Sequence, residues 1–375
     1  MQRYARAVTF SLVALGGLSL AQDATKPLTI GVVYVYSKLG KQDRGYNETV
    51  SEGIRRATKD FAVTLKEYVP PSNVIGSEMK TFTAGKYDLL IGIGFQNQDL
   101  ISNAAKAKSG NAYVIVDNAS DQANVDSIVF REEEGSFMVG YLAALKSTTG
   151  NIGFVGGMDI PIIQRFEAGY VAGARAANKN IKVYSAYAGR TPKAFNDPET
   201  GKSISQTLIR KGVDIIFTAA GTTGDGVISL VNATQCLKAS ALPEGLKFKS
   251  DPYSSIPKSA AYSNKCSAAD RPVFFIGVDS NQNYLGDEDG DPSTLNHGLS
   301  SMVKNLDVAV YSTIQEVAQG RFKSGTLSFG LNENGVGYAY DKYNSPLISK
   351  SEYAALQKVN KDVALGNIKV PIHRQ

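Results

Sequence analysis

Two ionisable residues at the ends of apolar segments are the strongest candidates for chemistry in this sequence. Asp279 ends the β-branched run 273–278, and Lys304 follows the uncharged stretch 299–303. A carboxylate accepts two hydrogen bonds at once, which suits the vicinal hydroxyl groups of a sugar. An ammonium group can donate to the same hydroxyls and balance a buried aspartate, although a lysine at a strand end can also reach water. The pair therefore predicts a site for a hydroxylated small molecule.

Tyr46 and Asn47 follow a polar turn and open an amphipathic segment. The tyrosine ring offers a stacking face to a planar ligand, or it packs locally on the surface. The asparagine amide carries donors and an acceptor that match the mixed edge of a purine, although asparagine is also a common helix cap. Both residues are candidates for recognising a heterocycle, and each has a structural alternative.

Three further positions lie in or directly after apolar runs. Asp117 follows the run 112–116, where ligand contact and helix capping fit equally well. Phe217 lies inside the run 215–219, so composition alone assigns its ring to the core. The turn that begins at Gly221 is rich in glycine but lacks the lysine of a phosphate-binding loop. We interpret this turn as a close backbone approach to a neutral ligand.

The sequence argues against several functional classes. Its two histidines, His297 and His373, offer no plausible acid–base or nucleophile pair, so we expect a binding protein without a cofactor rather than an enzyme. The acidic segment 286–291 lacks the later glutamate of a known calcium loop. Charges of both signs are mixed along the chain, and no basic stripe indicates nucleic-acid binding.

Short β-branched runs alternate with amphipathic segments, which is typical of parallel sheets covered by helices. A helix is predicted over 48–61, where apolar residues recur at helical spacing. Strands are predicted at 28–34, 89–93 and 112–116 and, after a connection near 130, at 151–155, 181–187, 215–219 and 273–278. Two doubly wound sheets in succession predict two lobes around a cleft. Such sheets bind ligands outside the carboxyl ends of their strands, where most of the candidate residues lie.

The first residues combine Arg3, Arg6, an apolar run over 7–20 and small residues at its end. This pattern indicates a secretory signal peptide spanning 1–21, since the run is too short and too interrupted for a membrane anchor. The mature chain is expected to begin at Gln22. Because no cysteine near that point could carry a lipid, the expected location is periplasmic or secreted.

The chain has two cysteines, Cys236 and Cys266. In an oxidising compartment such a pair favours a disulfide over two buried thiols, and the spacing matches no metal or redox motif. We therefore predict a structural disulfide that closes the insertion 236–266, which is rich in serine and lysine.

Six stretches carry a family resemblance: 43–47 (DRGYN), 134–137 (EGSF), 153–174, 219–224 (AAGTTG), 276–280 (IGVDS) and 301–304 (SMVK). Through them, nearly the whole mature chain resembles the basic membrane protein family of ABC-transporter substrate-binding proteins, whose best known members bind purine nucleosides. The resemblance implies an α/β, type I periplasmic-binding-protein fold with two doubly wound lobes joined by a short multi-strand hinge. It also implies delivery of the ligand to an inner-membrane ABC permease.

In the family, two aromatic rings hold the nucleoside base, and a carboxylate and a lysine hold the ribose. Carried over to this sequence, the resemblance implies Tyr46 and Phe217 as the two rings and Asn47 as the amide that reads the base. It implies Asp279 and Lys304 as the ribose ligands.

The resemblance also implies one more acidic position that reads the base, between Asp117 and Glu134, with its register left open. This sequence departs from the family at Tyr46, where phenylalanine is commoner, and in the insertion 236–266. It also lacks the cysteine for lipid attachment. The first departure could change ligand preference, and the last argues against membrane tethering.

The expected boundaries give a first lobe of residues 27–131 and 304–322, and a second lobe of 132–303 and 323–375. We expect a monomer whose partners are a nucleoside and a permease, without nucleic acid. A secreted nucleoside-processing hydrolase and a periplasmic sensor of the same ligand are the alternatives. A transcription regulator of this fold would need DNA-binding helices where the export signal stands.

Overall fold

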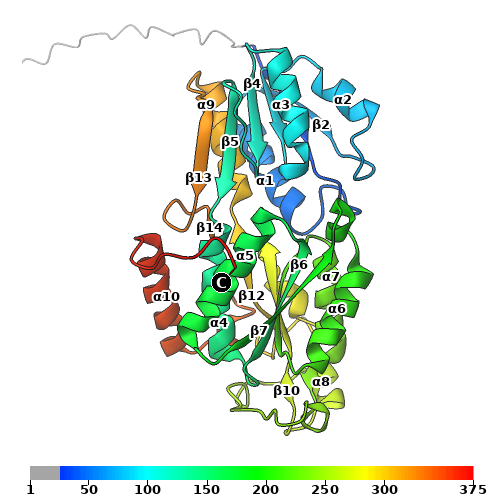
Figure 1. Ribbon diagram of the computed structural model, residues 1–375, viewed down its shortest axis with the longest axis vertical. Coiled ribbons are helices and arrows are strands. Elements are labelled where there is room, and N and C mark those ends of the chain that lie inside the picture. Colours follow the sequence, from blue (N-terminus) through cyan, green and yellow to red (C-terminus); the bar gives the residue numbers. More distant parts are fainter. Residues whose placement is uncertain (1–25, 375) are drawn as a thin grey trace, which may run out of the picture.

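The computed structural model describes residues 26–374, which form two α/β lobes placed end to end (Figure 1). The predicted signal peptide, residues 1–21, lies outside the described residues. Within the described residues, no helix combines the length and the apolar character needed to cross a membrane.

The sheet of the first lobe has six parallel strands in the order β13-β5-β4-β3-β1-β2. The strands are β1 (Leu28–Val33), β2 (Val63–Tyr68), β3 (Leu89–Gly92), β4 (Ala112–Val116), β5 (Val125–Phe130) and β13 (Gly325–Phe329). Its helices are α1 (Tyr46–Asp60), α2 (Ser77–Thr83), α3 (Gln98–Ala107) and α9 (Leu306–Ala318). The central strand β3 is buried along its whole length, because helices cover both faces of a parallel sheet.

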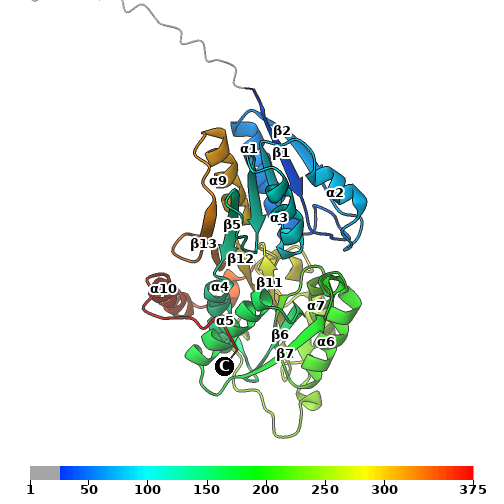
Figure 2. The ribbon, with the colours of Figure 1, turned by 45° about the horizontal axis from the view of Figure 1, so that its top comes forward.

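The second lobe repeats this plan with the strand order β14-β12-β11-β8-β6-β7, in which β14 runs antiparallel to β12. The strands are β6 (Asn151–Met158), β7 (Lys182–Gly189), β8 (Ile215–Ala219), β11 (Phe274–Asp279), β12 (Gly298–Lys304) and β14 (Val336–Tyr338). The helices are α4 (Glu132–Lys146), α5 (Pro161–Ala177), α6 (Pro198–Arg210), α7 (Thr223–Thr234), α8 (Ala260–Lys265) and α10 (Lys350–Ala364). Figure 2 shows α4, α5, α6 and α7 around this second sheet, clear of the first one. The predicted pair of doubly wound lobes is confirmed.

Helix α1 begins at Tyr46, two residues before the predicted start. The Asp43 carboxylate accepts hydrogen bonds at 3.1, 3.0 and 3.1 Å from the backbone N–H groups of Gly45, Asn47 and Glu48. These bonds satisfy donors that the start of a helix leaves free. They also fix the point at which the Tyr46 side chain leaves the helix.

Helices α4 and α5 lie in close contact because glycines remove the side chains between them. A Cβ atom at Gly169 would lie 2.2 Å from the backbone oxygen of Glu133, and one at Gly173 would lie 1.9 Å from that of Phe137. A larger residue at either position would push the helices apart. This contact holds Phe166, in the second turn of α5, close to the start of α4.

The chain passes between the lobes three times: before α4, after β12 and after β13. The crossing segments are bonded to one another. The backbone N–H of Arg131 donates to the carbonyl oxygen of Phe329, and that of Asn305 donates to Gly335, both at 2.8 Å. The short multi-strand hinge is therefore one assembly of three connected segments.

Strand β13 corrects one of the expected lobe boundaries. The sequence boundary assigned residues 323–375 to the second lobe, but β13 pairs with β5 of the first sheet along its whole length. The strand is a largely exposed edge, so its composition has no buried apolar run to reveal it. Residues 336–338 and α10 lie with the second lobe, as expected.

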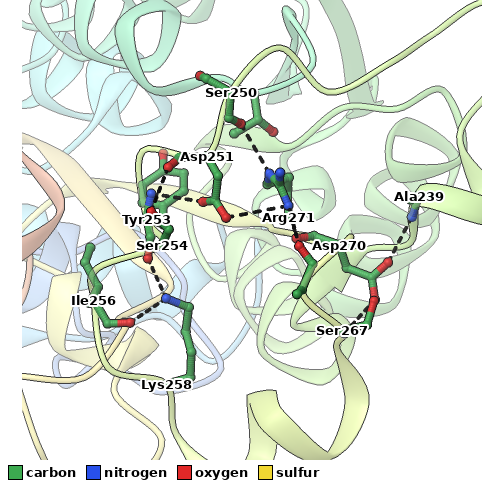
Figure 3. A network of polar contacts seen from close by, with 12 residues as sticks. Ala239, Ser250, Asp251, Tyr253, Ser254, Ile256, Lys258, Ser267, Asp270 and Arg271 are labelled. Carbon is green, nitrogen blue, oxygen red and sulfur yellow. Dashed lines mark hydrogen bonds and ion pairs between the residues drawn. The ribbon is translucent and has the colours of Figure 1, made fainter.

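The predicted disulfide between Cys236 and Cys266 is present, with a Cα–Cα distance of 6.2 Å. The insertion that it closes lies at the end of the second lobe farthest from the first (Figure 1). Polar contacts fix this insertion to the chain that follows it (Figure 3). The Arg271 guanidinium lies 3.6 Å from the Asp251 carboxylate, and the Asp270 carboxylate accepts a 2.9 Å hydrogen bond from the N–H of Ala239.

Replacing both cysteines with serine should lower the free energy of unfolding by about 2–4 kcal/mol, since the cross-link restricts the unfolded chain. The closed loop has a sequence separation of 30 residues. Urea denaturation of the oxidised wild type and of the double variant measures the difference. Adding a reductant should weaken the wild type alone. Equal stability of the oxidised wild type and the variant would contradict a stabilising role.

Candidate ligand-binding cleft

A cavity lies between the two lobes. The walls come from both lobes, mostly from segments that follow the carboxyl ends of strands, where open α/β sheets bind ligands. The lining residues are Val35, Tyr36, Ser37, Asp43, Tyr46, Gly94, Phe95, Gln96, Asp117, Ile162, Ile163, Phe166, Phe195, Asn196, Ala219, Gly221, Thr222, Val278, Asp279 and Lys304.

Lys304 ends β12 at the second crossing, and its side chain is only 1 % exposed. Its ammonium nitrogen donates to Asp117 Oδ1 at 2.5 Å and to Glu132 Oε1 at 3.0 Å. The same nitrogen lies 4.7 Å from the centre of the Phe130 ring, within the range of a cation–π contact. The ion cluster thus joins the first lobe, through Asp117, to two of the three crossing segments.

The carboxylates around Lys304 stabilise its positive charge. Burial alone would lower the pKa of Lys304, but Asp117, Glu132 and Asp279 raise it above its usual value, so the side chain is charged. The second oxygen of Glu132 accepts a 2.8 Å hydrogen bond from the Arg165 guanidinium. Neither Glu132 nor Arg165 was predicted as part of a site. Glu132 stood in the acidic run 132–134, which has the composition of a solvated surface.

Tyr46 and Asp117 form a second contact at the cavity wall. The Tyr46 hydroxyl donates to Asp117 Oδ2 at 2.6 Å, while Lys304 occupies Oδ1. Burial and the nearby Asp117 carboxylate raise the pKa of Tyr46 well above its usual value, so the hydroxyl keeps its proton. Both oxygens of Asp117 are therefore held by protein donors.

Asp279 differs from Asp117 because its carboxylate has no hydrogen-bond donor among the described residues. It ends β11 in the left-handed backbone region, with φ of 65°, and its side chain lines the cavity. Burial raises its pKa to about 7; Lys304 opposes this shift, whereas Asp117, Asp43 and Glu132 add to it. This carboxylate is available to a ligand.

Aromatic side chains from both lobes line the cavity. Tyr46 and Phe95 come from the first lobe, and Phe166 and Phe195 come from the second. Phe95 and Phe195 meet edge to face across the lobes, with ring centres 6.1 Å apart. The predicted aromatic character of the site is present, but most of these rings differ from the predicted ones.

Phe217 does not line the cavity, which corrects the sequence prediction. Its ring is fully buried and packs against Tyr170 and Phe154, with ring centres 5.2 and 5.7 Å away. Successive strand residues point to opposite faces of the sheet, and here the ring points towards the helices that cover it. The composition of β8 had indicated this core position, and only the family resemblance had moved the ring into the cleft.

Asn47 is also fully buried and does not line the cavity. Its amide nitrogen donates to the carbonyl oxygens of Val35 and Gly40, both at 3.0 Å, and so fixes the loop after β1. Gln96 lines the cavity instead, in the turn after β3. Its position after a predicted strand was the available signal, because such turns are where ligands bind. Gly221 lines the cavity, with φ of 55°.

Direct contacts also hold the two lobes together over the cleft. The Arg44 guanidinium donates to Asp225 at the start of α7 at 2.8 Å. The Asn196 amide nitrogen donates to the carbonyl oxygen of Tyr36 at 3.2 Å, and its oxygen accepts from the N–H of Lys38 at 3.3 Å. The cleft is therefore in a closed arrangement.

A metal site is not evident in the part of the chain that the structure describes, where no three His, Cys, Asp or Glu side chains are grouped to hold one. In the acidic segment 286–291, the carboxylates of Asp287, Asp289 and Asp291 accept hydrogen bonds from nearby residues of the same loop. The segment closes on itself as an exposed turn.

Two doubly wound lobes that close over a cavity define the type I periplasmic-binding fold. A solved structure has the same fold: the chain is similar to an ABC transporter solute-binding protein from Aeropyrum pernix K1. Their TM-score is 0.72 at 24% identity, and the match covers 93% of this chain and 94% of that one. The predicted fold class is confirmed.

Sequence comparison identifies the family. Residues 31–235 match the family described as ABC transporter substrate-binding protein PnrA-like. The chain is 33% identical over 343 residues to the CD4+ T-cell-stimulating antigen of Listeria monocytogenes, covering 88% of this chain and 85% of that protein. It is 32% identical over 344 residues to the ABC transporter nucleoside-binding protein BmpA of Lactococcus lactis, covering 88% and 86%. The chain belongs to the PnrA-like family of ABC transporter substrate-binding proteins.

Lys304→Met should lower the free energy of unfolding by about 3–5 kcal/mol at pH 7, because it leaves buried carboxylates unpaired. Lys358→Met, at an exposed position on α10, is the matched control and should change it by less than about 0.5 kcal/mol. Urea denaturation measures both. The deficit of Lys304→Met should shrink as pH falls, because protonation neutralises the unpaired carboxylates. A deficit no larger than that of the control would show that the cluster does not stabilise the fold.

Proposed function

We propose that this protein captures a nucleoside, with a purine as the favoured base, in the cleft and delivers it to an ABC transporter permease. One observation carries the proposal: aromatic rings from both lobes share a cavity with an unpaired carboxylate, Asp279, beside the ammonium of Lys304. Rings suit a planar base, and a carboxylate beside a donor suits a ribose. The relative from L. lactis, named as a nucleoside-binding protein, supports the same ligand class.

For the base, we assign the contact surface to Tyr46, Phe95, Phe166 and Phe195. Stacking of a base on an aromatic ring contributes roughly 1–3 kcal/mol in nucleic-acid complexes and does not depend on the base. Gln96, whose amide carries both donors and an acceptor, replaces Asn47 as the proposed reader of the base edge. All four rings line the cavity, whereas Phe217, which the family resemblance implied, is buried in the core.

For the ribose, the sequence assignment of Asp279 and Lys304 is retained. The Asp279 carboxylate can accept from two vicinal hydroxyls, whereas each oxygen of Asp117 already accepts one hydrogen bond, from Tyr46 or from Lys304. A hydroxyl is also a suitable partner for a carboxylate that has no protein donor. Asp279 is therefore the proposed sugar anchor, and Asp117 is the group that positions Lys304 and Tyr46.

The proposal includes an exported, monomeric protein that carries out no reaction on its ligand. The main alternative is a hydrolase that splits the nucleoside. In the cleft, Asp43 accepts hydrogen bonds from the start of α1 and Asp117 from Lys304 and Tyr46, which leaves Asp279 as the lining carboxylate without a protein donor. A sensor of the same ligand would use the same cleft and differ only in its partner.

Calorimetric titration with adenosine, guanosine and inosine tests the proposal. Phe195→Ala should weaken binding by about 1–3 kcal/mol through the loss of one ring contact. Phe217→Leu is the matched control: it should lower stability by about 1–2 kcal/mol but leave affinity within about twofold, because that ring lies in the core. Chromatography of the same mixtures should show no free base. Absence of binding by every nucleoside would refute the ligand class, and released base would favour the hydrolase.

Affinity should depend on pH through Asp279, whose pKa is raised to about 7. Ribose hydroxyls donate to the ionised carboxylate, so affinity should rise with pH, by up to about tenfold per unit below pH 7, and level off above about 8. The free energy of unfolding of the ligand-free protein should change in the opposite direction. Because Asp279 binds its proton more tightly in the folded protein than in the unfolded chain, this free energy should fall as the pH rises from 3.8, the usual pKa of the group, to about 7.

Titrations at several pH values, repeated with Asp279→Asn, measure this dependence. The variant should bind more weakly and lose most of the pH dependence. Wild-type affinity that stays constant between pH 6 and 8 would remove Asp279 from the sugar site.

A further inference from the structure

We infer that the cleft excludes phosphorylated ligands, so that it accepts a nucleoside but rejects the corresponding nucleotide. This inference rests on the proposed function and adds to it a physical basis, the charge on the cavity wall, for distinguishing nucleosides from nucleotides. It is drawn from the distribution of charge and of free N–H donors around the cavity.

Negative groups outnumber positive ones on the cavity wall. Its lining includes the carboxylates of Asp43, Asp117 and Asp279, while Lys304 is the one cationic side chain among the lining residues. Behind Lys304 lies another carboxylate, Glu132, at 3.0 Å. A phosphate group placed here would bring up to two more negative charges close to these carboxylates.

The cation that could offset this charge is already engaged. The Lys304 ammonium donates to Asp117 and Glu132, so a phosphate would have to compete with two carboxylates for it. The nearest arginines are engaged as well: Arg165 donates to Glu132, and Arg44 donates to Asp225 on the other lobe. Neither arginine lines the cavity.

The other common way to hold a phosphate, the free N–H groups at a helix start, is limited here. At α1 the Asp43 carboxylate occupies the position that an anion would take, since it accepts from three backbone N–H groups there. Helix α5 begins with Pro161, which has no N–H, so only the N–H groups of Ile162 and Ile163 remain at the part of this helix start that lines the cavity. At α7 the first N–H groups, from Thr223 and Gly224, bond to carbonyl oxygens of the preceding turn.

The neutral hydroxyls of a sugar fit this environment because they can donate to Asp279. A ribose anchored there keeps its 5′ carbon in the same cavity, so a charged 5′ group would be held near the carboxylates. If nucleotides are the external source of the ligand, hydrolysis of the phosphate monoester must come before capture.

The decisive experiment compares two adenosine derivatives of nearly identical shape, the neutral 5′-carboxamide and the anionic 5′-carboxylate, with adenosine and adenosine 5′-monophosphate beside them. Calorimetry on the wild-type protein at pH 8 should show the carboxylate binding at least about 100-fold more weakly than the carboxamide, since placing like charges together is strongly unfavourable. The monophosphate should bind at least as weakly as the carboxylate. The matched pair separates charge from size.

Asp279→Asn should narrow the gap between carboxamide and carboxylate by about tenfold, because it removes one negative charge from the cavity. Asp291→Asn, in the exposed acidic loop, is the control and should leave the gap unchanged. Equal affinity of the wild type for the two derivatives, or for adenosine and its monophosphate, would overturn the exclusion of anions. Failure of adenosine itself to bind would instead refute the nucleoside assignment, so the two failures are distinguishable.

Discussion

The buried ammonium of Lys304 is the constraint on which the cleft depends. A charge removed from water has to be compensated by nearby opposite charges with good hydrogen-bond geometry. Here the compensation comes from Asp117 of the first lobe and from Glu132, where the chain first enters the second lobe. Because Lys304 itself ends β12 at the next crossing, one electrostatic requirement fixes two crossing segments and one cavity wall together.

The carboxylates around the cleft fall into two groups: some accept hydrogen bonds from the protein, and one, Asp279, accepts none from the described residues. Asp43 caps α1, and each oxygen of Asp117 accepts a hydrogen bond, from Tyr46 or from Lys304. Asp279 receives no such bond, and its raised pKa reflects burial that nothing in the cavity fully offsets. An arrangement of this kind leaves part of the stability of the closed lobes to be supplied by a ligand, which is how binding can shift a two-state equilibrium.

Other contacts across the closed cleft differ in strength. The carbonyl oxygen of Arg44 accepts hydrogen bonds at 2.7 Å from the Ser280 hydroxyl and at 2.9 Å from the Gln282 amide nitrogen. The Arg44–Asp225 pair is partly exposed, with 40% and 22% of the side chains accessible, so water screens it. The bonds of Asn196 to the loop after β1 are at the long end of the normal range, at 3.2 and 3.3 Å. The bonds within the hinge do not involve these contacts, so the hinge could keep its geometry if the lobes separated. The disulfide-closed insertion lies at the far end of the second lobe, away from the cleft.

The sequence by itself determined the features that depend on local order along the chain. The period of apolar residues gave the alternating strands and helices. The carboxyl ends of those strands led to Asp279, Lys304 and Gly221 on the cavity wall, because parallel strands bring their ends to one edge. The pair Cys236 and Cys266 followed from the chemistry of an oxidising compartment.

Only the tertiary structure decided which side chains meet, because contacts between distant segments leave no periodic signal. Glu132 looked like part of a solvated acidic run until burial beside Lys304 gave it a partner 172 residues away. Phe195, in a short 3-10 turn after β7, lines the cavity, whereas the ring of Phe217, inside β8, lies in the core. The difference is set by where each segment lies in the fold and not by residue type. Residues 325–329 joined the first sheet through backbone pairing with β5, which any exposed sequence of suitable length could provide.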